Sequence, residues 1–211
     1  MSRTWLAELV FPGRCPGCGG PAEPVCATCR AELRPAPAAP APLDLEAWFA
    51  PFAYVGTARE LVARVKYRDC RAAVPWLADA IVEMLGARTC DVVTWVPTTR
   101  ARRRSRGFDH AQLLAHAVAR RLELACPTLL VRSAGPAQTG RSLADRRVGP
   151  TFRAKRPISG ARVLLVDDVA TTGATLSAAA RALRRAGARG VIGATAARTP
   201  SRRGVSSVHS G

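Results

Sequence analysis

Residues 163–175, VLLVDDVATTGAT, decide the fold class and the candidate site of this chain. Four apolar residues run into Asp167 and Asp168, as at the carboxyl end of a buried parallel strand, where α/β sheets bind their ligands. The loop that follows has small and hydroxyl side chains and opens into a helix, whose N-terminal N–H groups can hold an anion. Two carboxylates beside an anion site predict a ligand with hydroxyls or a metal near a phosphate, such as a ribose 5-phosphate.

Three other interpretations of this stretch were weighed. A phospho-receiver domain also begins with paired acids, but it needs an aspartate on a later strand, and no Asp or Glu follows Asp168. A P-loop is excluded because the chain contains no G-x-x-x-x-G-K-[ST] pattern. A polar turn without any ligand stays possible, although adjacent carboxylates repel each other unless something compensates them.

The composition points to a partner that carries phosphate. The chain has 211 residues, 48% of them hydrophobic, and a formal net charge of +17. Such an excess of basic residues is typical of proteins that bind nucleic acid or other phosphates. A GC-rich genome would explain the preference for arginine over lysine, but not the shortage of acids. The N-terminus resembles no signal peptide and no apolar run is long enough for a membrane span, so we expect a cytoplasmic protein.

The N-terminal cysteines predict a structural zinc site. Cys15 and Cys18 form one C-x-x-C pair, and Cys26 and Cys29 form a second. Two such pairs can present four thiolates to one tetrahedral zinc ion, which leaves no open position for catalysis. A redox role is the alternative, but redox C-x-x-C motifs normally occur singly. The remaining cysteines, Cys70, Cys90 and Cys126, are expected to be small buried hydrophobic residues.

The order of motifs predicts four regions along the chain. A zinc-binding module would cover residues 1–33, and the Pro/Ala run at 34–43 would be a semi-rigid linker. An α/β domain would follow over residues 44–197, and a basic disordered tail over 198–211.

Periodicity within the α/β domain predicts strands that alternate with helices, and therefore a parallel sheet with helices on its faces. A strand broken at Pro51 is expected within 47–55. A capping box at Thr57–Glu60 would open a helix that buries Leu61, Val62 and Val65. The further expected helices are 74–86, one that starts with Asp109 and Gln112, and 176–187, and the further expected strands are 91–96, 127–131, 162–167 and 190–195.

The quoted motifs resemble a known family. Residues 163–175 resemble the phosphoribosyl-pyrophosphate (PRPP) signature of type I phosphoribosyltransferases. The whole series resembles the ComF family of competence-associated proteins, over roughly residues 8–197. The series comprises the four cysteines, VKYR at 65–68, VPTTRARRRSRGF at 96–108, Gln138 with Arg146 and Arg147, and the 163–175 segment. The resemblance implies a type I phosphoribosyltransferase-like parallel sheet with flanking helices, preceded by a small four-cysteine zinc module.

The resemblance also implies roles for individual residues. Asp167 and Asp168 would contact the ribose hydroxyls, directly or through magnesium. The PRPP 5-phosphate would lie in the loop made by Ala170, Thr171, Thr172, Gly173, Ala174 and Thr175. Pyrophosphate would be bound by Thr98, Thr99 and Arg100. A mobile loop over 132–155 would contribute Gln138, Arg146, Arg147 and Lys155.

The sequence departs from the family pattern at two places that matter here. The family often reads R-G-F-N-Q where this chain has RGFDH at 106–110, and it commonly has asparagine soon after the arginine pair, where this chain has VGP at 148–150. Enzymes of this fold that salvage 6-oxopurines carry an aspartate at the position of Thr171, which argues against that reaction.

The acceptor of a phosphoribosyl transfer is not identifiable from the sequence. No residue is clearly placed as a general base, and His110 and His116 are expected on a helix surface without a function. The run of arginines at Arg100, Arg102, Arg103, Arg104 and Arg106 serves either pyrophosphate or a nucleic-acid backbone. The alternatives are therefore a PRPP-binding protein of DNA uptake, an active phosphoribosyltransferase, and a non-catalytic adaptor that binds single-stranded DNA or DNA-uptake proteins.

Overall fold

The computed structural model describes residues 14–22, 24–67, 73–99, 101, 103–104, 107–133 and 150–200. Its main element is a parallel sheet in the order β1-β7-β6-β3, and β2 continues beyond β1 along the same side of β7. The strands are β1 (Ala47–Phe49), β2 (Phe52–Ala53), β3 (Val92–Trp95), β6 (Arg162–Ala170) and β7 (Gly190–Arg198). The predicted parallel sheet is confirmed.

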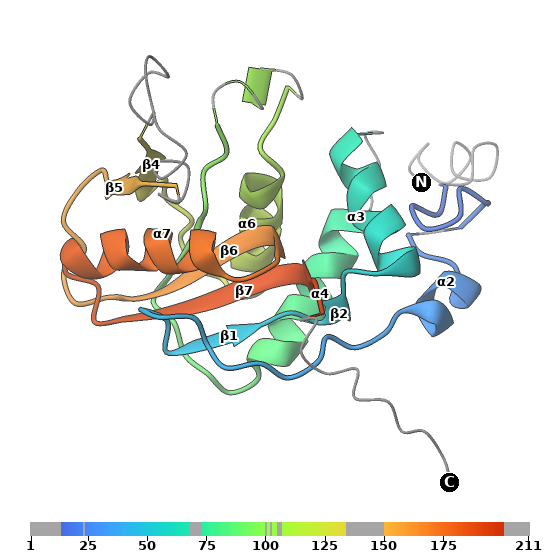
Figure 1. Cartoon of the computed structure of the whole chain (residues 1–211), viewed down its shortest axis with the longest axis horizontal. Helices are drawn as coiled ribbons and strands as arrows, with labels where there is room; N and C mark the ends of the chain where they lie inside the picture. Colours follow the sequence, from blue (N-terminus) through green and yellow to red (C-terminus); the bar gives the residue numbers. More distant parts are fainter. Residues whose placement is uncertain are drawn as a thin grey trace, which may run out of the picture.

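Helices cover both faces of this sheet (Figure 1). On one face lies α7 (Ala174–Arg185), which packs on Val163, Leu165 and Val191. On the other face lie α3 (Gly56–Tyr67), α4 (Ala73–Leu85) and α6 (His110–Arg121), which share a core with Leu164 and Val166. Because neighbouring residues of a strand point to opposite faces, the apolar run of β6 is buried on both sides.

The helix predicted from a capping box exists, but its start differs from the prediction. Leu61, Val62 and Val65 are buried as expected. However, α3 already includes Gly56, so Thr57 is not its N-cap. The Thr57 hydroxyl instead donates to the Glu32 carboxylate at 2.5 Å, and this bond joins α3 to the short helix α2 (Ala27–Glu32) of the cysteine module.

A second, smaller sheet lies beside the first (Figure 1). It pairs β4 (Leu130–Arg132) with β5 (Phe152–Ala154) in the antiparallel direction. The strand predicted at 127–131 is therefore shifted to 130–132 and is not part of the parallel sheet. β5 was not predicted, because three residues are too few to establish a period and they fall within the segment expected to be a mobile loop.

The Pro/Ala run crosses the molecule in contact with the α/β body. We call residues 34–44 the strap. At one end, Ala53 N–H donates to Arg34 O and Ala36 N–H donates to Pro51 O. At the other end, the Ser177 hydroxyl donates to Leu43 O at 2.6 Å, and Arg181 pairs with Asp44 at 3.0 Å. The strap thus connects the cysteine module to α7.

Candidate functional site

The two aspartates of the 163–175 segment lie within a strand. The sequence analysis ended this strand at 167, but β6 continues to Ala170. Asp167 and Asp168 are both half-buried near its carboxyl end. The Asp168 N–H donates to Asp167 Oδ1 at 2.8 Å, and the Val169 N–H donates to Asp168 Oδ1 at 2.6 Å. Each carboxylate therefore accepts a bond from the next peptide, which partly offsets the cost of holding two negative charges together.

Asp168 faces the side of the sheet that α3, α4 and α6 cover. Together with His110 it supplies the polar lining of a cavity of about 20 Å³, whose other lining residues are Val62, Val65, Val74, Leu77, Leu114 and Ala196. A cavity of this size holds about one water molecule. His110 is 6% exposed, so the expectation of a surface histidine is wrong. The helical period could have separated it from the exposed His116, because His110 lies four residues before Leu114 and therefore on the buried face of the helix.

The loop after β6 has the geometry of an anion site. Gly173 is the residue before α7 and has a φ of 74°, in the left-handed region that favours glycine. Thr171, Thr172 and Ala174 are exposed, and the Ala174 N–H donates to the Thr172 hydroxyl at 3.4 Å. The helix begins at Ala174, two residues earlier than predicted, and this brings its N-terminus directly to the loop.

The connection between β3 and α6 begins beside the two aspartates. Val96 N–H donates to Val166 O, which extends the β3–β6 pairing toward Asp168. The next residues, Thr98 and Thr99, are half-buried. Asp109, at the far end of the connection, is bonded to its beginning, because Asp109 Oδ2 accepts the Thr98 N–H at 2.9 Å. Burial raises the pKa of the Asp109 carboxyl, and the charge of Asp168 raises it further, while the bond from Thr98 works in the opposite direction.

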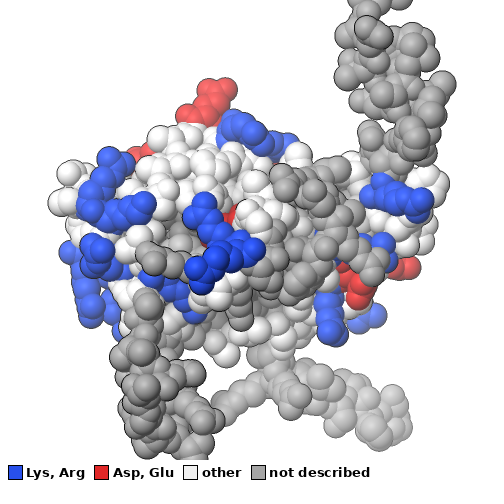
Figure 2. Space-filling model, turned by 90° about the horizontal axis from the view of Figure 1, so that it is seen from above, with Lys and Arg blue, Asp and Glu red and all other residues white. Residues whose placement is uncertain are grey.

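The basic residues predicted to serve the site fall into two groups. Arg103, Arg104 and Lys155 are exposed, and Lys155 directly follows β5, where its N–H donates to Leu129 O. Figure 2 shows Lys and Arg side chains spread over the face seen from above in Figure 1, with fewer Asp and Glu. Six predicted residues lie outside the described residues: Arg100, Arg102, Arg106, Gln138, Arg146 and Arg147.

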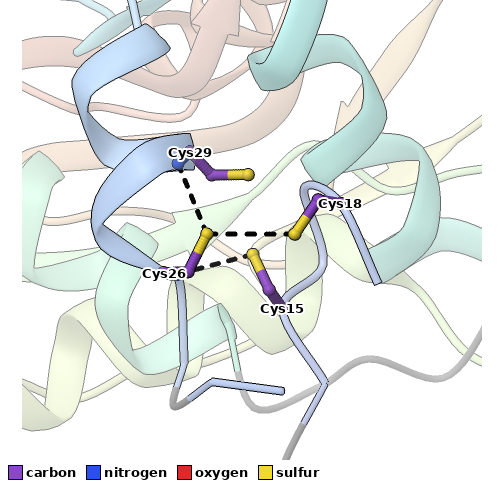
Figure 3. Close-up of side chains that lie close together, drawn as sticks. All are labelled: Cys15, Cys18, Cys26 and Cys29. Atoms are coloured by element: carbon purple, nitrogen blue, oxygen red, sulfur yellow. Dashed lines mark hydrogen bonds between the residues drawn. The ribbon is translucent and has the colours of Figure 1, made fainter. Parts of the chain in front are cut away.

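The four cysteines of the N-terminal module converge on one point, as Figure 3 shows. Their sulfur atoms all lie within 4.8 Å of one another, and the Sγ atoms of Cys18 and Cys26 are 3.8 Å apart. Four sulfurs at about 2.3 Å from a tetrahedral zinc ion would be about 3.8 Å apart, so this donor set fits zinc. Cys15 and Cys29 belong to the same core cluster as Leu61, which anchors the module on α3.

The thiols of this cluster differ in acidity. Burial alone would raise the pKa of Cys15, but the N–H groups of Cys26, Cys18 and Gly17 outweigh it and lower this pKa to about 6. Burial and the neighbouring thiols raise the pKa of Cys29. Metal binding requires thiolates, and Cys15 already favours that form at neutral pH. Cys90 and Cys126 are half-buried and pack against the core, which is less burial than expected, and Cys70 lies outside the described residues.

No helix in the described ranges has the length and apolar character that crossing a membrane requires.

Comparison with known proteins identifies the body of the chain. Residues 109–209 match the family model of the phosphoribosyl transferase domain. An adenine phosphoribosyltransferase of Gluconacetobacter diazotrophicus is 34% identical over 123 residues, which are 56% of this chain and 66% of that protein. The DNA utilization protein YhgH of Escherichia coli is 31% identical over 110 residues, which are 50% of this chain and 48% of YhgH.

Solved structures match the chain only weakly. The glutamine PRPP amidotransferase of B. subtilis has a TM-score of 0.44 and 25% identity, over 60% of this chain and 26% of its own. The matches to curated relatives thus span about half to two thirds of those proteins. Together with the four-cysteine cluster, the family model and the two relatives confirm the resemblance stated from the sequence.

Proposed function

Since this chain is a ComF-type protein with a phosphoribosyl transferase domain, we propose that it binds PRPP with magnesium at the carboxyl edge of β6. One observation carries this proposal: two half-buried carboxylates lie on the strand that leads directly into an accessible helix N-terminus. Carboxylates suit ribose hydroxyls and the hard cation magnesium, and a helix N-terminus suits a phosphate. PRPP carries all of these groups within one molecule.

Different residues of the site would contact different parts of PRPP. The loop over 171–175 would hold the 5-phosphate with its N–H groups and hydroxyls, while Asp167 and Asp168 hold the ribose. Thr98 and Thr99 begin the connection that would hold pyrophosphate, together with basic side chains. Magnesium, when bound with PRPP, would neutralise part of the pyrophosphate charge.

A thermal-shift experiment tests this proposal. PRPP with magnesium should raise the melting temperature of the wild-type chain, because a ligand that binds only the folded state stabilises it. Asp167→Asn with Asp168→Asn should abolish the shift. Asp79→Asn with Asp91→Asn is the matched control, since it removes the same charge from a helix and from the opposite edge of the sheet. If the wild type shows no shift, the proposal is wrong.

Catalysis is a second question about the same site. A transfer would form a bond from an acceptor nitrogen to ribose C1 while the C1–O bond to pyrophosphate breaks, and the acceptor would lose a proton. The similarity to an adenine phosphoribosyltransferase makes adenine the first acceptor to test. Release of pyrophosphate should be measured with adenine, other bases, nucleosides and DNA ends. Release with none of these acceptors would leave PRPP binding as the function.

A role in the use of external DNA is the second candidate function. The name of YhgH and the exposed arginines of the β3–α6 connection support it. Single-stranded DNA should bind with an affinity that falls steeply with salt. Arg103→Ala with Arg104→Ala should weaken this binding, while Arg59→Ala with Arg185→Ala, on α3 and α7, should not. If the two double variants bind DNA with equal affinity, the arginine run does not contribute to DNA binding. A reducing cytoplasm would suit the zinc-bound thiolates of such a protein.

A further inference from the structure

Asp109 stands at the start of α6 and faces both its own helix and the connection from β3. It is the N-cap residue, and aspartate at this position usually accepts N–H bonds from the first helical turn. Here the N–H groups of Gln112 and Ala111 are close enough to lower the pKa of its carboxyl, but the hydrogen bond that the carboxylate completes is the one from the N–H of Thr98, at 2.9 Å. Asp109 is 7% exposed, so a buried charge is used for this bond.

This bond joins the two ends of the connection between β3 and α6, which we call the excursion. On one side, β3 is fixed to β6 through Val96. On the other side, α6 is fixed in the core through Leu114 and Val118. Between them, Arg103 N–H donates to Thr99 O and Gly107 N–H donates to Arg103 O. The described part of this excursion is therefore held at its base, where Thr98 and Asp109 meet.

The base of the excursion lies on the same side of the sheet edge as the paired aspartates. The β3–β6 pairing runs through Trp95 and Val166, so Thr98 emerges alongside the end of β6. The charge of Asp168 also raises the pKa of Asp109. Pyrophosphate bound next to the ribose would consequently meet the Thr99 peptide.

We infer that Asp109 is a positioning residue for pyrophosphate: by holding the Thr98 N–H it sets the direction of the Thr99 amide that follows. This inference rests on the proposed PRPP site and adds a residue to it that touches no ligand. It also means that the Thr98 N–H is occupied by Asp109, so that Thr98 can contact a ligand only through its hydroxyl.

Binding measurements on three variants test the inference. Asp109→Ser keeps a good N-cap for α6 but is too short to replace the carboxylate at Thr98. Asp109→Asn retains an oxygen in the same place. Asp91→Ala is the matched control, because Asp91 also accepts a backbone N–H, from Arg162 at 2.7 Å, at the opposite edge of the same pair of strands. All are compared with the wild type for binding of PRPP, pyrophosphate and ribose 5-phosphate, with magnesium present.

The expected pattern separates positioning from simple destabilisation. Asp109→Ser should weaken PRPP and pyrophosphate about tenfold, the effect of losing one hydrogen bond to a charged group, and leave ribose 5-phosphate unchanged. Asp109→Asn should restore binding to within about twofold of the wild type, and Asp91→Ala should leave all three affinities unchanged. Hydrogen exchange should show the Thr98 amide protected in the wild type and in Asp109→Asn, but not in Asp109→Ser.

Two results would overturn the inference. Wild-type pyrophosphate affinity in Asp109→Ser would show that Asp109 positions nothing. An equal loss for all three ligands would show a general structural role. If the wild type itself binds neither PRPP nor pyrophosphate, the proposed function fails together with the inference. The exchange measurement reports on the fold of each variant, because α6 amides should stay protected in all of them.

Discussion

Gly173, at the start of α7, lies directly against Pro42 of the strap. A Cβ atom on Gly173 would collide with the Cγ atom of Pro42, and the φ of Gly173 is left-handed. The loop before α7 therefore rests on a segment that begins at the cysteine module. The strap was predicted only as a linker, but its Pro42 contacts the loop of the candidate site.

Gly173→Ala should destabilise the protein and weaken binding of PRPP. A left-handed alanine costs about 1–2 kcal/mol, and the collision with Pro42 adds to this. Urea unfolding and the PRPP-induced thermal shift measure the two effects. Gly86→Ala is the matched control, since Gly86 has a φ of 57° and nothing within 4 Å of its Cβ position. If both variants lose the same free energy of unfolding, the contact with Pro42 contributes nothing to the effect of Gly173→Ala.

Ser177→Ala should loosen the strap more than Arg181→Ala does. The Ser177 hydroxyl is nearly buried and its loss leaves Leu43 O without this donor, at a cost of about 1 kcal/mol. Arg181 and Asp44 form an exposed pair, and such pairs contribute about 0–1 kcal/mol. The two free energies of unfolding should be compared at low and at high salt. Only the Arg181→Ala difference should shrink with salt, and the opposite order would contradict this description of the strap.

Metal analysis should find about one zinc ion per chain, and a chelator should lower the melting temperature. Cys15→Ser should abolish zinc binding and lower stability strongly, because Cys15 is fully buried and belongs to the main core. Cys90→Ser is the control, as Cys90 is half-buried and outside the cluster. Retention of zinc by Cys15→Ser would contradict the four-thiolate assignment.

The raised pKa of Asp109 predicts a pH dependence of stability. Between the ordinary carboxyl pKa and the raised value, the folded chain holds a proton that the unfolded chain has released. Stability should therefore fall as the pH rises through this window. Asp109→Asn removes the charge and should be more stable than the wild type at neutral pH, but not at acidic pH. Urea midpoints from acidic to neutral pH measure this. A difference in stability between Asp109→Asn and the wild type that does not change with pH would refute the prediction.

The sequence predicted the elements whose apolar pattern is strong. The runs around Val93 and Leu164 are short and rich in β-branched residues, which is typical of buried strands, and the spacing of Leu114 and Val118 is typical of a buried helix face. The end of β6 was misplaced because Asp167 and Asp168 interrupt the apolar run, although the backbone pairing with β7 continues past them. Hydrogen bonding between strands does not depend on side-chain polarity.

The parts of the site that were missed depend on contacts between distant residues. Asp109 has the sequence signature of a helix cap, but the signature does not show that its carboxylate also accepts the Thr98 N–H. Thr57 likewise bonds to Glu32 instead of its own helix. A local pattern shows that a side chain can accept or donate a bond, but the nearest partner is set by the packing of the whole chain.

The pairing of β1 with β7 has a consequence for how the chain folds during synthesis. Ala47 lies beside Ile192, so the first strand of the sheet meets its neighbour only when almost the entire body has left the ribosome. Until then the aromatic segment around Trp48 and Phe49 has no strand to pair with. Contacts between such distant segments slow folding and leave apolar surface open to aggregation. The cysteine module is synthesised before this aromatic segment, and zinc would allow it to fold early. It would then give the unpaired aromatic segment a folded neighbour.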